Sequence, residues 1–204
     1  MITIIDYGLG NIRAFVNVYE RLNIQTKIAR SADDISKATK LILPGVGAFD
    51  HAMTLLNQSG MLRELEKQVL QNGVPVLGIC VGMQILAKSS EEGVLPGLGW
   101  FDGHVRRFDT FKLPLRTRLP HMGWNTIRPV KDHSLLMGLN QESRFYFLHS
   151  YYFDCSNHNE ILATTEYGVD FACAVNKNNI FGVQFHPEKS HSNGIRILLN
   201  FSKI

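Results

Sequence analysis

A cysteine between two glycines is the residue in this sequence with the clearest potential for chemistry. Gly78 and Gly82 flank Cys80, and the apolar run 74–79 leads into this pattern. The run predicts a β-strand, the glycines allow a sharp turn with close backbone approach, and a helical pattern follows. Free N–H groups at the start of that helix favour a thiolate. The stretch therefore predicts a nucleophile elbow like that of serine hydrolases, with sulfur in place of oxygen.

A cysteine nucleophile needs a base and a further group that orients the base. The tripeptide His186-Pro187-Glu188 follows the apolar run 180–185. Side chains two residues apart on an extended backbone project to the same side, so Glu188 can hold one nitrogen of His186 while the other faces Cys80. Pro187 fixes its own φ and disfavours a helical conformation at His186. We predict a catalytic triad of Cys80, His186 and Glu188.

An oxyanion hole requires two N–H donors near the attacked carbonyl oxygen. Val81, directly after the cysteine, can provide one donor, and Val46 or Gly47 can provide the other. Alone, the segment 44–47 is also typical of an ordinary turn after a strand. A dinucleotide site fits poorly, because Asp50 stands where the Gly-x-Gly-x-x-Gly pattern needs its third glycine.

Composition limits the classes of protein to which the chain can belong. Its 204 residues are 45% hydrophobic and 19% charged, which predicts one compact domain over residues 1–204. A net charge of +3 without a basic cluster argues against nucleic-acid binding. No run approaches the roughly 18 apolar residues of a membrane span, so we expect a cytoplasmic protein. Three cysteines without Cys-x-x-Cys spacing argue against a disulfide framework and a metal site.

Strand and helix patterns alternate in the first half of the sequence. We expect strands at 1–7, 26–29, 40–43 and 74–79, with helices between them. Alternation of this kind predicts a largely parallel sheet covered on both faces, with ligands at the carboxyl ends of its strands.

The second half consists mainly of short β-like runs. These lie at 97–108, 124–130, 145–153, 161–166, 172–176 and 180–185, and a closing helix is expected at 193–201. With so little helix between them, the runs predict a mostly antiparallel portion.

Three ordered motifs resemble those of the triad, or class I, glutamine amidotransferases. They are the segments 44–47, 78–84 and 184–188. Segments 6–11, 120–125 and 147–152 are similar to those of glutaminase subunits of imidazole glycerol phosphate synthases. The resemblance implies a flavodoxin-like open mixed α/β sheet flanked by helices, with an additional antiparallel portion.

The same resemblance implies an activity and a partner. A glutaminase of this kind hydrolyses glutamine through a thioester and needs no cofactor. Its ammonia passes to a separate (β/α)-barrel cyclase, bound as a heterodimer, which makes imidazole glycerol phosphate and AICAR in histidine biosynthesis. We therefore also expect low glutaminase activity in the isolated chain.

Residue roles follow from the resemblance position by position. Cys80 is the nucleophile, His186 the base and then the acid, and Glu188 its orienter. Substrate-binding positions are Gly45, Gln84, Glu92, His149, Ser150 and Tyr151, and oxyanion positions are Val46, Gly47 and Val81. Partner-interface positions are Asn11, Met122, Gly123, Trp124 and Asn125. Val81 replaces the usual leucine but retains its N–H, and His121 and His149 are also consistent with hydrogen-bonded structural histidines.

Alternative functions remain open at this point. A paralogous glutaminase can feed ammonia to an enzyme that builds surface-polysaccharide sugars. A catalytically silent regulatory subunit would keep the fold and bind a partner, but the intact triad residues argue against it. A DJ-1-like chaperone or hydrolase would share the elbow cysteine without needing His186 and Glu188.

Overall fold

Parallel strands form the half of the molecule that carries the elbow. The computed structural model describes residues 1–109, 111 and 118–204. In it, neighbouring strands run parallel in the order β2, β1, β3, β4 and β13. Their bounds are β1 Ile2–Ile5, β2 Thr26–Ala29, β3 Leu41–Gly45, β4 Val76–Cys80 and β13 Ile180–Val183. All except β2 are buried along their whole length, as strands covered on both faces must be.

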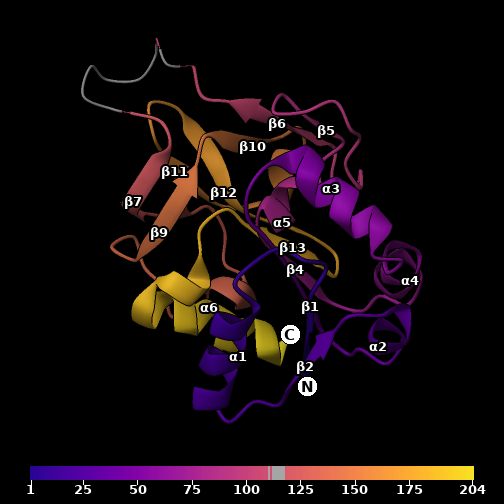
Figure 1. The fold of residues 1–204 in the computed structure, drawn as a ribbon. Coiled ribbons are helices and arrows are strands. Elements are labelled where there is room, and N and C mark those ends of the chain that lie inside the picture. Colours follow the sequence, from indigo (N-terminus) through magenta and orange to yellow (C-terminus); the bar gives the residue numbers. More distant parts are fainter. Residues whose placement is uncertain (110, 112–117) are drawn as a thin grey trace.

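Helices cover both faces of these parallel strands (Figure 1). Helices α1 and α6 lie together on one side, and α2, α3 and α4 lie on the other. The α-helices are α1 Ile12–Arg21, α2 Ala32–Ser36, α3 Phe49–Gln58, α4 Leu62–Glu66, α5 Val81–Gln84 and α6 His191–Lys203. A π-helical segment spans Lys67–Gln71, and 3₁₀ turns span Ser134–Leu136, His158–Glu160 and Pro187–Lys189.

Local signals explain where the first helices begin. The side chain of Asn11 accepts a hydrogen bond of 3.3 Å from the N–H of Ala14 and so caps α1. Ser31 caps α2 in the same way, with the N–H of Asp34 as donor. Both caps satisfy N–H groups that have no partner inside the helix.

Antiparallel strands dominate the second half, as the sequence predicted. Strand β12 pairs antiparallel with β13, β10 and β11, and β6 pairs antiparallel with β10 and parallel with β5. A separate two-stranded antiparallel sheet joins β7 to β9. The bounds are β5 Ser89–Ser90, β6 Gly103–Arg107, β7 His121–Thr126, β8 Arg128–Pro129, β9 Arg144–His149, β10 Tyr151–Cys155, β11 Ile161–Glu166 and β12 Asp170–Lys177.

The apolar run 145–153, expected to be one strand, is divided at Ser150. Strand β9 pairs with β7 in the small sheet, whereas β10 pairs with β6 and β12 in the large one. Alternating burial looks the same on both sides of the division, so the pattern alone does not reveal it. The break places His149, Ser150 and Tyr151 where the chain passes between the two sheets.

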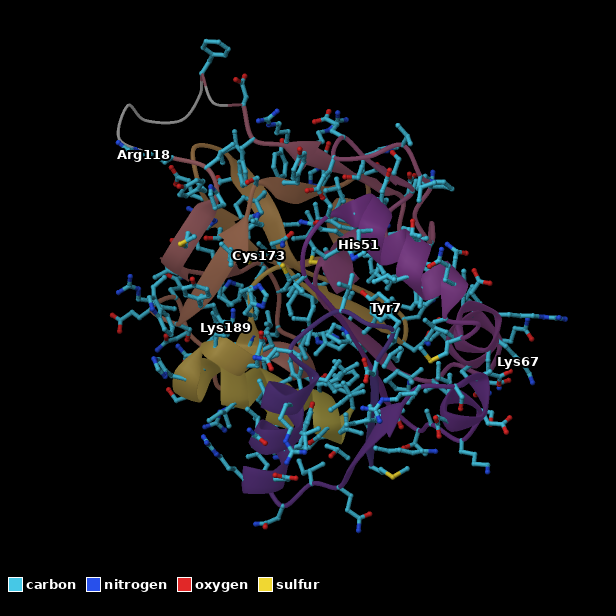
Figure 2. The ribbon with its side chains drawn as sticks, in the orientation of Figure 1. Tyr7, His51, Lys67, Arg118, Cys173 and Lys189 are labelled. Carbon is cyan, nitrogen blue, oxygen red and sulfur yellow. The ribbon has the colours of Figure 1, made fainter. Side chains whose placement is uncertain are left out.

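Side chains fill the space between the layers (Figure 2). Cys173, on β12, is fully buried in this interior, whereas Lys67 lies at the periphery. The predicted open mixed sheet flanked by helices, with an additional antiparallel portion, is confirmed. Over the described ranges, none of the helices has the length and apolar character needed to cross a membrane.

Candidate active site

Cys80 stands at a strained turn between β4 and α5. Its φ is +55°, in the left-handed region that residues other than glycine seldom adopt. Such a conformation costs on the order of 1–3 kcal/mol and persists only where the surrounding structure enforces it. The helical pattern beyond it forms a single turn, Val81–Gln84. The predicted strand, elbow and helix are therefore present, with a helix shorter than the pattern suggested.

The two glycines of the elbow are needed because backbone segments meet there. A Cβ on Gly82 would overlap the carbonyl oxygen of Leu43 on β3. A Cβ on Gly78 would lie 2.6 Å from the carbonyl oxygen of Gly82. Real Cβ contacts are longer than this, so the elbow can form only with glycine at both positions.

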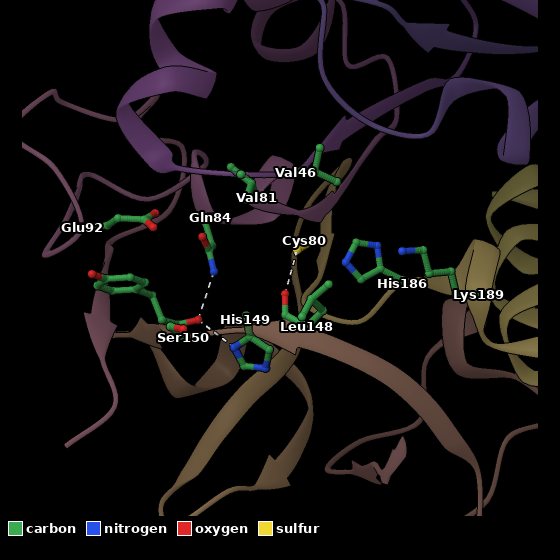
Figure 3. A pocket seen from close by; sticks show the side chains of 12 residues that line it. Val46, Cys80, Val81, Gln84, Glu92, Leu148, His149, Ser150, His186 and Lys189 are labelled. Carbon is green, nitrogen blue, oxygen red and sulfur yellow. Dashed lines mark hydrogen bonds between the residues drawn. The ribbon is translucent and has the colours of Figure 1, made fainter. Parts of the chain in front are cut away.

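His186 and Glu188 form the buried pair that the sequence predicted. Nδ1 of His186 lies 2.9 Å from Oε1 of Glu188, and both side chains are almost fully buried. The backbone of the histidine is fixed as well, because its N–H donates to the carbonyl of Tyr146 on β9 and its carbonyl accepts from the hydroxyl of Ser190. The ring is thereby held beside Cys80 (Figure 3).

The charges of this trio favour an imidazolium at His186. Burial alone lowers the pKa of His186, but hydrogen bonds to Cys80 and Glu188 and the negative charges of both partners outweigh it and raise the pKa to about 10. Since Nδ1 donates to Glu188, the other nitrogen is directed at the sulfur. The arrangement directs a proton-bearing imidazole nitrogen at the sulfur, which suits a histidine that assists nucleophilic attack.

A cavity opens beside the sulfur of Cys80 (Figure 3). Its volume is about 130 Å³. The residues that line it are Val46, Gly47, Cys80, Val81, Gln84, Glu92, Leu148, His149, Ser150, Tyr151, His186 and Lys189. It therefore brings together the predicted nucleophile, base, oxyanion residues and most predicted substrate residues.

Hydrogen bonds hold both ends of the segment that carries Val46 and Gly47. The hydroxyl of Tyr7 donates to the carbonyl of Pro44 at 2.7 Å. At the other end, Oε2 of Glu92 accepts a 2.8 Å hydrogen bond from the N–H of Phe49. Burial raises the pKa of Glu92, partly offset by this hydrogen bond. These contacts hold the segment against the cavity.

Gly45 and Glu188 lie behind the cavity. Gly45 pairs in register with Cys80, and a Cβ at this position would overlap the backbone of Gly82. Gly45 therefore packs β3 closely against the elbow, and its contact with substrate stays a prediction. Glu188 reaches the site through His186, as an orienting group does.

The predicted interface residues divide between the two faces of β7. Met122 and Trp124 face outward, with 62% and 38% of their surface exposed. Trp124 also stacks on the ring of His191, with centroids 5.0 Å apart. Gly123 and Asn125 are half-buried. Asn11 is exposed, but its side chain caps α1, so the structure gives it a local role in addition to the predicted one.

Comparison with known proteins assigns the chain to a family. Residues 3–203 match the family Glutamine amidotransferase class-I. The chain belongs to this family. Proteins named imidazole glycerol phosphate synthase subunit HisH are 58% identical in Bdellovibrio bacteriovorus and 48% identical in Leptospira interrogans, each over 100% of both chains. A solved structure titled "Crystal structure of glutamine amidotransferase" shares the fold, with a TM-score of 0.74 at 22% identity, covering 100% of this chain and 99% of that one.

Three residues lie at the site of this amidotransferase without having been predicted there. The carbonyl oxygen of Leu148 is 3.9 Å from the sulfur of Cys80, and Nε2 of Gln184 is 3.8 Å from it. Lys189 lines the cavity. Gln184 had a detectable signal, because it is a polar residue two positions before His186, on the same side of an extended backbone. The carbonyl of Leu148 had none, since side-chain identity says nothing about a backbone group.

Proposed function

We propose that this chain hydrolyses glutamine to glutamate and ammonia, with Cys80 as nucleophile, His186 as base and acid, and Glu188 as the orienter of His186. The observation that carries the proposal is that Cys80, His186 and Glu188, from two distant segments, come together beside a small cavity in a class I amidotransferase. The residues that line the cavity suit an amino acid with charged α-groups.

Glu92 and Gln84 are proposed to select the substrate. The Glu92 carboxylate lines the cavity and can pair with the α-ammonium group of glutamine. Gln84 is buried, with its Nε2 held 3.0 Å from the carbonyl of Tyr151. His149, Ser150 and Tyr151 close the opposite side of the cavity.

The first half of the reaction forms a thioester. The sulfur of Cys80 attacks the side-chain carbonyl carbon of glutamine, and the oxygen becomes an oxyanion that the N–H groups of Val81 and of Val46 or Gly47 stabilise. The C–N bond breaks as the imidazolium of His186 gives its proton to the departing nitrogen, which leaves as ammonia.

The second half releases glutamate. Neutral His186 removes a proton from a water molecule, and the hydroxide oxygen attacks the thioester carbon. Collapse of this second oxyanion breaks the C–S bond and returns the sulfur to the thiolate beside the imidazolium. The sum is glutamine plus water giving glutamate plus ammonia.

We propose that the ammonia passes to a (β/α)-barrel cyclase that makes imidazole glycerol phosphate and AICAR in histidine biosynthesis, with the two subunits forming a heterodimer. The names and full-length coverage of the curated relatives support this proposal. The exposed side chains of Met122 and Trp124 are the proposed docking residues, together with Asn11, Gly123 and Asn125. The surface-sugar paralogue is not favoured, because the similar relatives carry the HisH name.

Domain organisation and location are proposed on related grounds. The family match over residues 3–203 supports one amidotransferase domain. A cytoplasmic location is supported by the unpaired state of the cysteines, all of which are buried.

The experiment that tests the glutaminase proposal measures glutamate release by the complex of this chain with its barrel partner. We expect Cys80→Ala to abolish release and Cys155→Ala, which removes another buried thiol, to retain it. An electrophilic glutamine analogue should label the unmodified chain at Cys80 alone. Glutamate release by the Cys80→Ala complex would contradict the mechanism, and a chain that binds the partner without labelling would be a silent regulatory subunit.

A further inference from the structure

Two buried histidines face each other next to the cavity. His121 on β7 and His149 on β9 are directly paired across the small sheet and are only 3% and 6% exposed. Nδ1 of His121 lies 3.0 Å from Nε2 of His149. The proposed reaction uses neither as an acid or a base, so their contact needs another explanation.

The hydrogen bonds around the pair fix which nitrogen carries each proton. Nδ1 of His149 lies 2.8 Å from the carbonyl oxygen of Tyr151, which can only accept, so this nitrogen is the donor. In the neutral ring Nε2 then accepts, and the proton between the rings belongs to His121. Nε2 of His121 is left as an acceptor for the amide of Asn125, 3.4 Å away. Burial lowers the pKa of both histidines, which keeps the rings neutral.

The inner end of this chain of hydrogen bonds reaches the nucleophile. The carbonyl oxygen of Tyr151 accepts from His149 and also from Nε2 of Gln84, at 3.0 Å. The same Nε2 donates to Oε1 of Gln184, also at 3.0 Å. Nε2 of Gln184 in turn lies 3.8 Å from the sulfur of Cys80. In each of these hydrogen bonds only one of the two atoms can donate. The position of one group therefore constrains the position of the next.

The outer end lies on the strand that carries the proposed docking residues. Met122 and Trp124 face outward on β7, whereas His121 faces inward on the same strand. The ring of His121 is held between the rings of Phe147 and Tyr167, nearly parallel to both, at centroid distances of 4.8 and 3.9 Å. A shift of β7 must therefore move His121 rather than be absorbed by loose packing.

We propose that His121 and His149 form a positioning relay through which the position of strand β7 sets the orientation of Gln84 and Cys80. This proposal rests on the proposed glutaminase function. It adds strand β7 as the element that adjusts the same site. The partner that acts on it is a protein surface docked over Met122 and Trp124.

Two substitutions of His121 test the relay. His121→Phe keeps a flat ring between Phe147 and Tyr167 but removes the donor to His149, which leaves a buried acceptor unpaired. His121→Asn places an amide nitrogen where Nδ1 stands and so retains that donor. Tyr167→Phe is the matched control, because its ring stays against His121 and only the hydroxyl bonded to the carbonyl of Arg118 is lost.

The measurement is kcat/KM for glutamine with the barrel partner at saturation, alongside the Kd for the partner and thermal unfolding of each variant. We expect His121→Phe to lower kcat/KM about tenfold with the Kd unchanged. His121→Asn should recover most of the loss, and Tyr167→Phe should match the unmodified chain. His121→Leu replaces the phenylalanine variant if that variant does not fold.

Contrary outcomes separate the relay from the function on which it rests. A kcat/KM for His121→Phe equal to that of the unmodified complex overturns the relay and leaves the glutaminase proposal standing. Equal losses in His121→Phe and His121→Asn would show a purely packing role and also overturn it. An unmodified complex that releases no glutamate overturns the proposed function, and the relay with it.

Discussion

The negative charge of Glu188 should set the protonation of His186, and Glu188→Gln isolates that charge. Glutamine has nearly the same shape as glutamate, and its amide oxygen can still accept from Nδ1 of His186. The substitution therefore keeps an acceptor for the 2.9 Å contact and removes the negative charge. Glu20→Gln, at an exposed position on α1, removes a carboxylate elsewhere and serves as the control.

The size of the effect follows from the burial of the pair. A pKa raised from 6.5 to about 10 corresponds to roughly 5 kcal/mol of preference for the charged ring. A buried opposite charge at hydrogen-bond distance accounts for about 1.4–4 kcal/mol of such a preference, and Cys80 supplies much of the rest. We expect the substitution to lower the pKa of His186 to about 8. At about pH 9 the charged fraction would then fall from roughly 90% to roughly 10%.

Proton and carbon NMR of the histidine Cε1 positions measures this pKa directly. The resonance of His186 is assigned by its loss in His186→Gln, and spectra are recorded between about pH 5 and pH 11. Glutaminase activity of the partner complex at about pH 9 should fall about tenfold in Glu188→Gln, because the fraction of His186 that is charged falls by about the same factor. The reasoning is refuted if His186 titrates near its ordinary value in the unmodified chain, or if its pKa is the same in Glu188→Gln.

The same pKa links His186 to stability. Because the folded-state value lies above 6.5, the folded chain binds more protons than the unfolded chain between the two values. The contribution to the free energy of unfolding is therefore complete below about pH 6.5 and is lost as the pH rises through about 10. Urea unfolding should show that Glu188→Gln loses this contribution to the free energy of unfolding at a lower pH than the unmodified chain does.

Three further substitutions test the elbow, the substrate contact and the docking strand. Gly82→Ala forces a methyl group onto the carbonyl of Leu43 and should lower the free energy of unfolding by about 3 kcal/mol or more in urea titrations. Glu92→Gln, which can still accept from the N–H of Phe49, should raise KM for glutamine about tenfold or more with stability unchanged. Trp124→Ala should weaken partner affinity at least tenfold by calorimetry, with the unfolding midpoint nearly unchanged.

Local sequence patterns were enough to predict the first half of the fold, the elbow at Cys80 and the contact between His186 and Glu188. Apolar runs stopped by glycine or proline marked β1, β3 and β4. The elbow could be predicted because Gly-x-Cys-x-Gly has few physical explanations. The contact of His186 with Glu188 was predicted from an extended backbone, whereas the structure forms it through the 3₁₀ turn Pro187–Lys189. These features depend on residues that are close together in the sequence.

Features that depend on partners distant in sequence could not be predicted in this way. The division of 145–153 at Ser150 is set by which strands lie beside β9 and β10. The proximity of Gly45 to Gly82 can be seen only once β3 lies against the elbow. The His121 and His149 contact likewise requires the register between β7 and β9.

Strain at the nucleophile and placement of its base have one structural origin. The positive φ of Cys80 costs roughly 1–3 kcal/mol, which the one-turn helix α5 cannot offset alone. The strain is sustained because β4 is paired in parallel with β3 on one side and β13 on the other, so the strand cannot relax. The chain leaves β13 and reaches His186 only three residues later. The pairing that enforces the strained cysteine therefore also delivers the histidine to it.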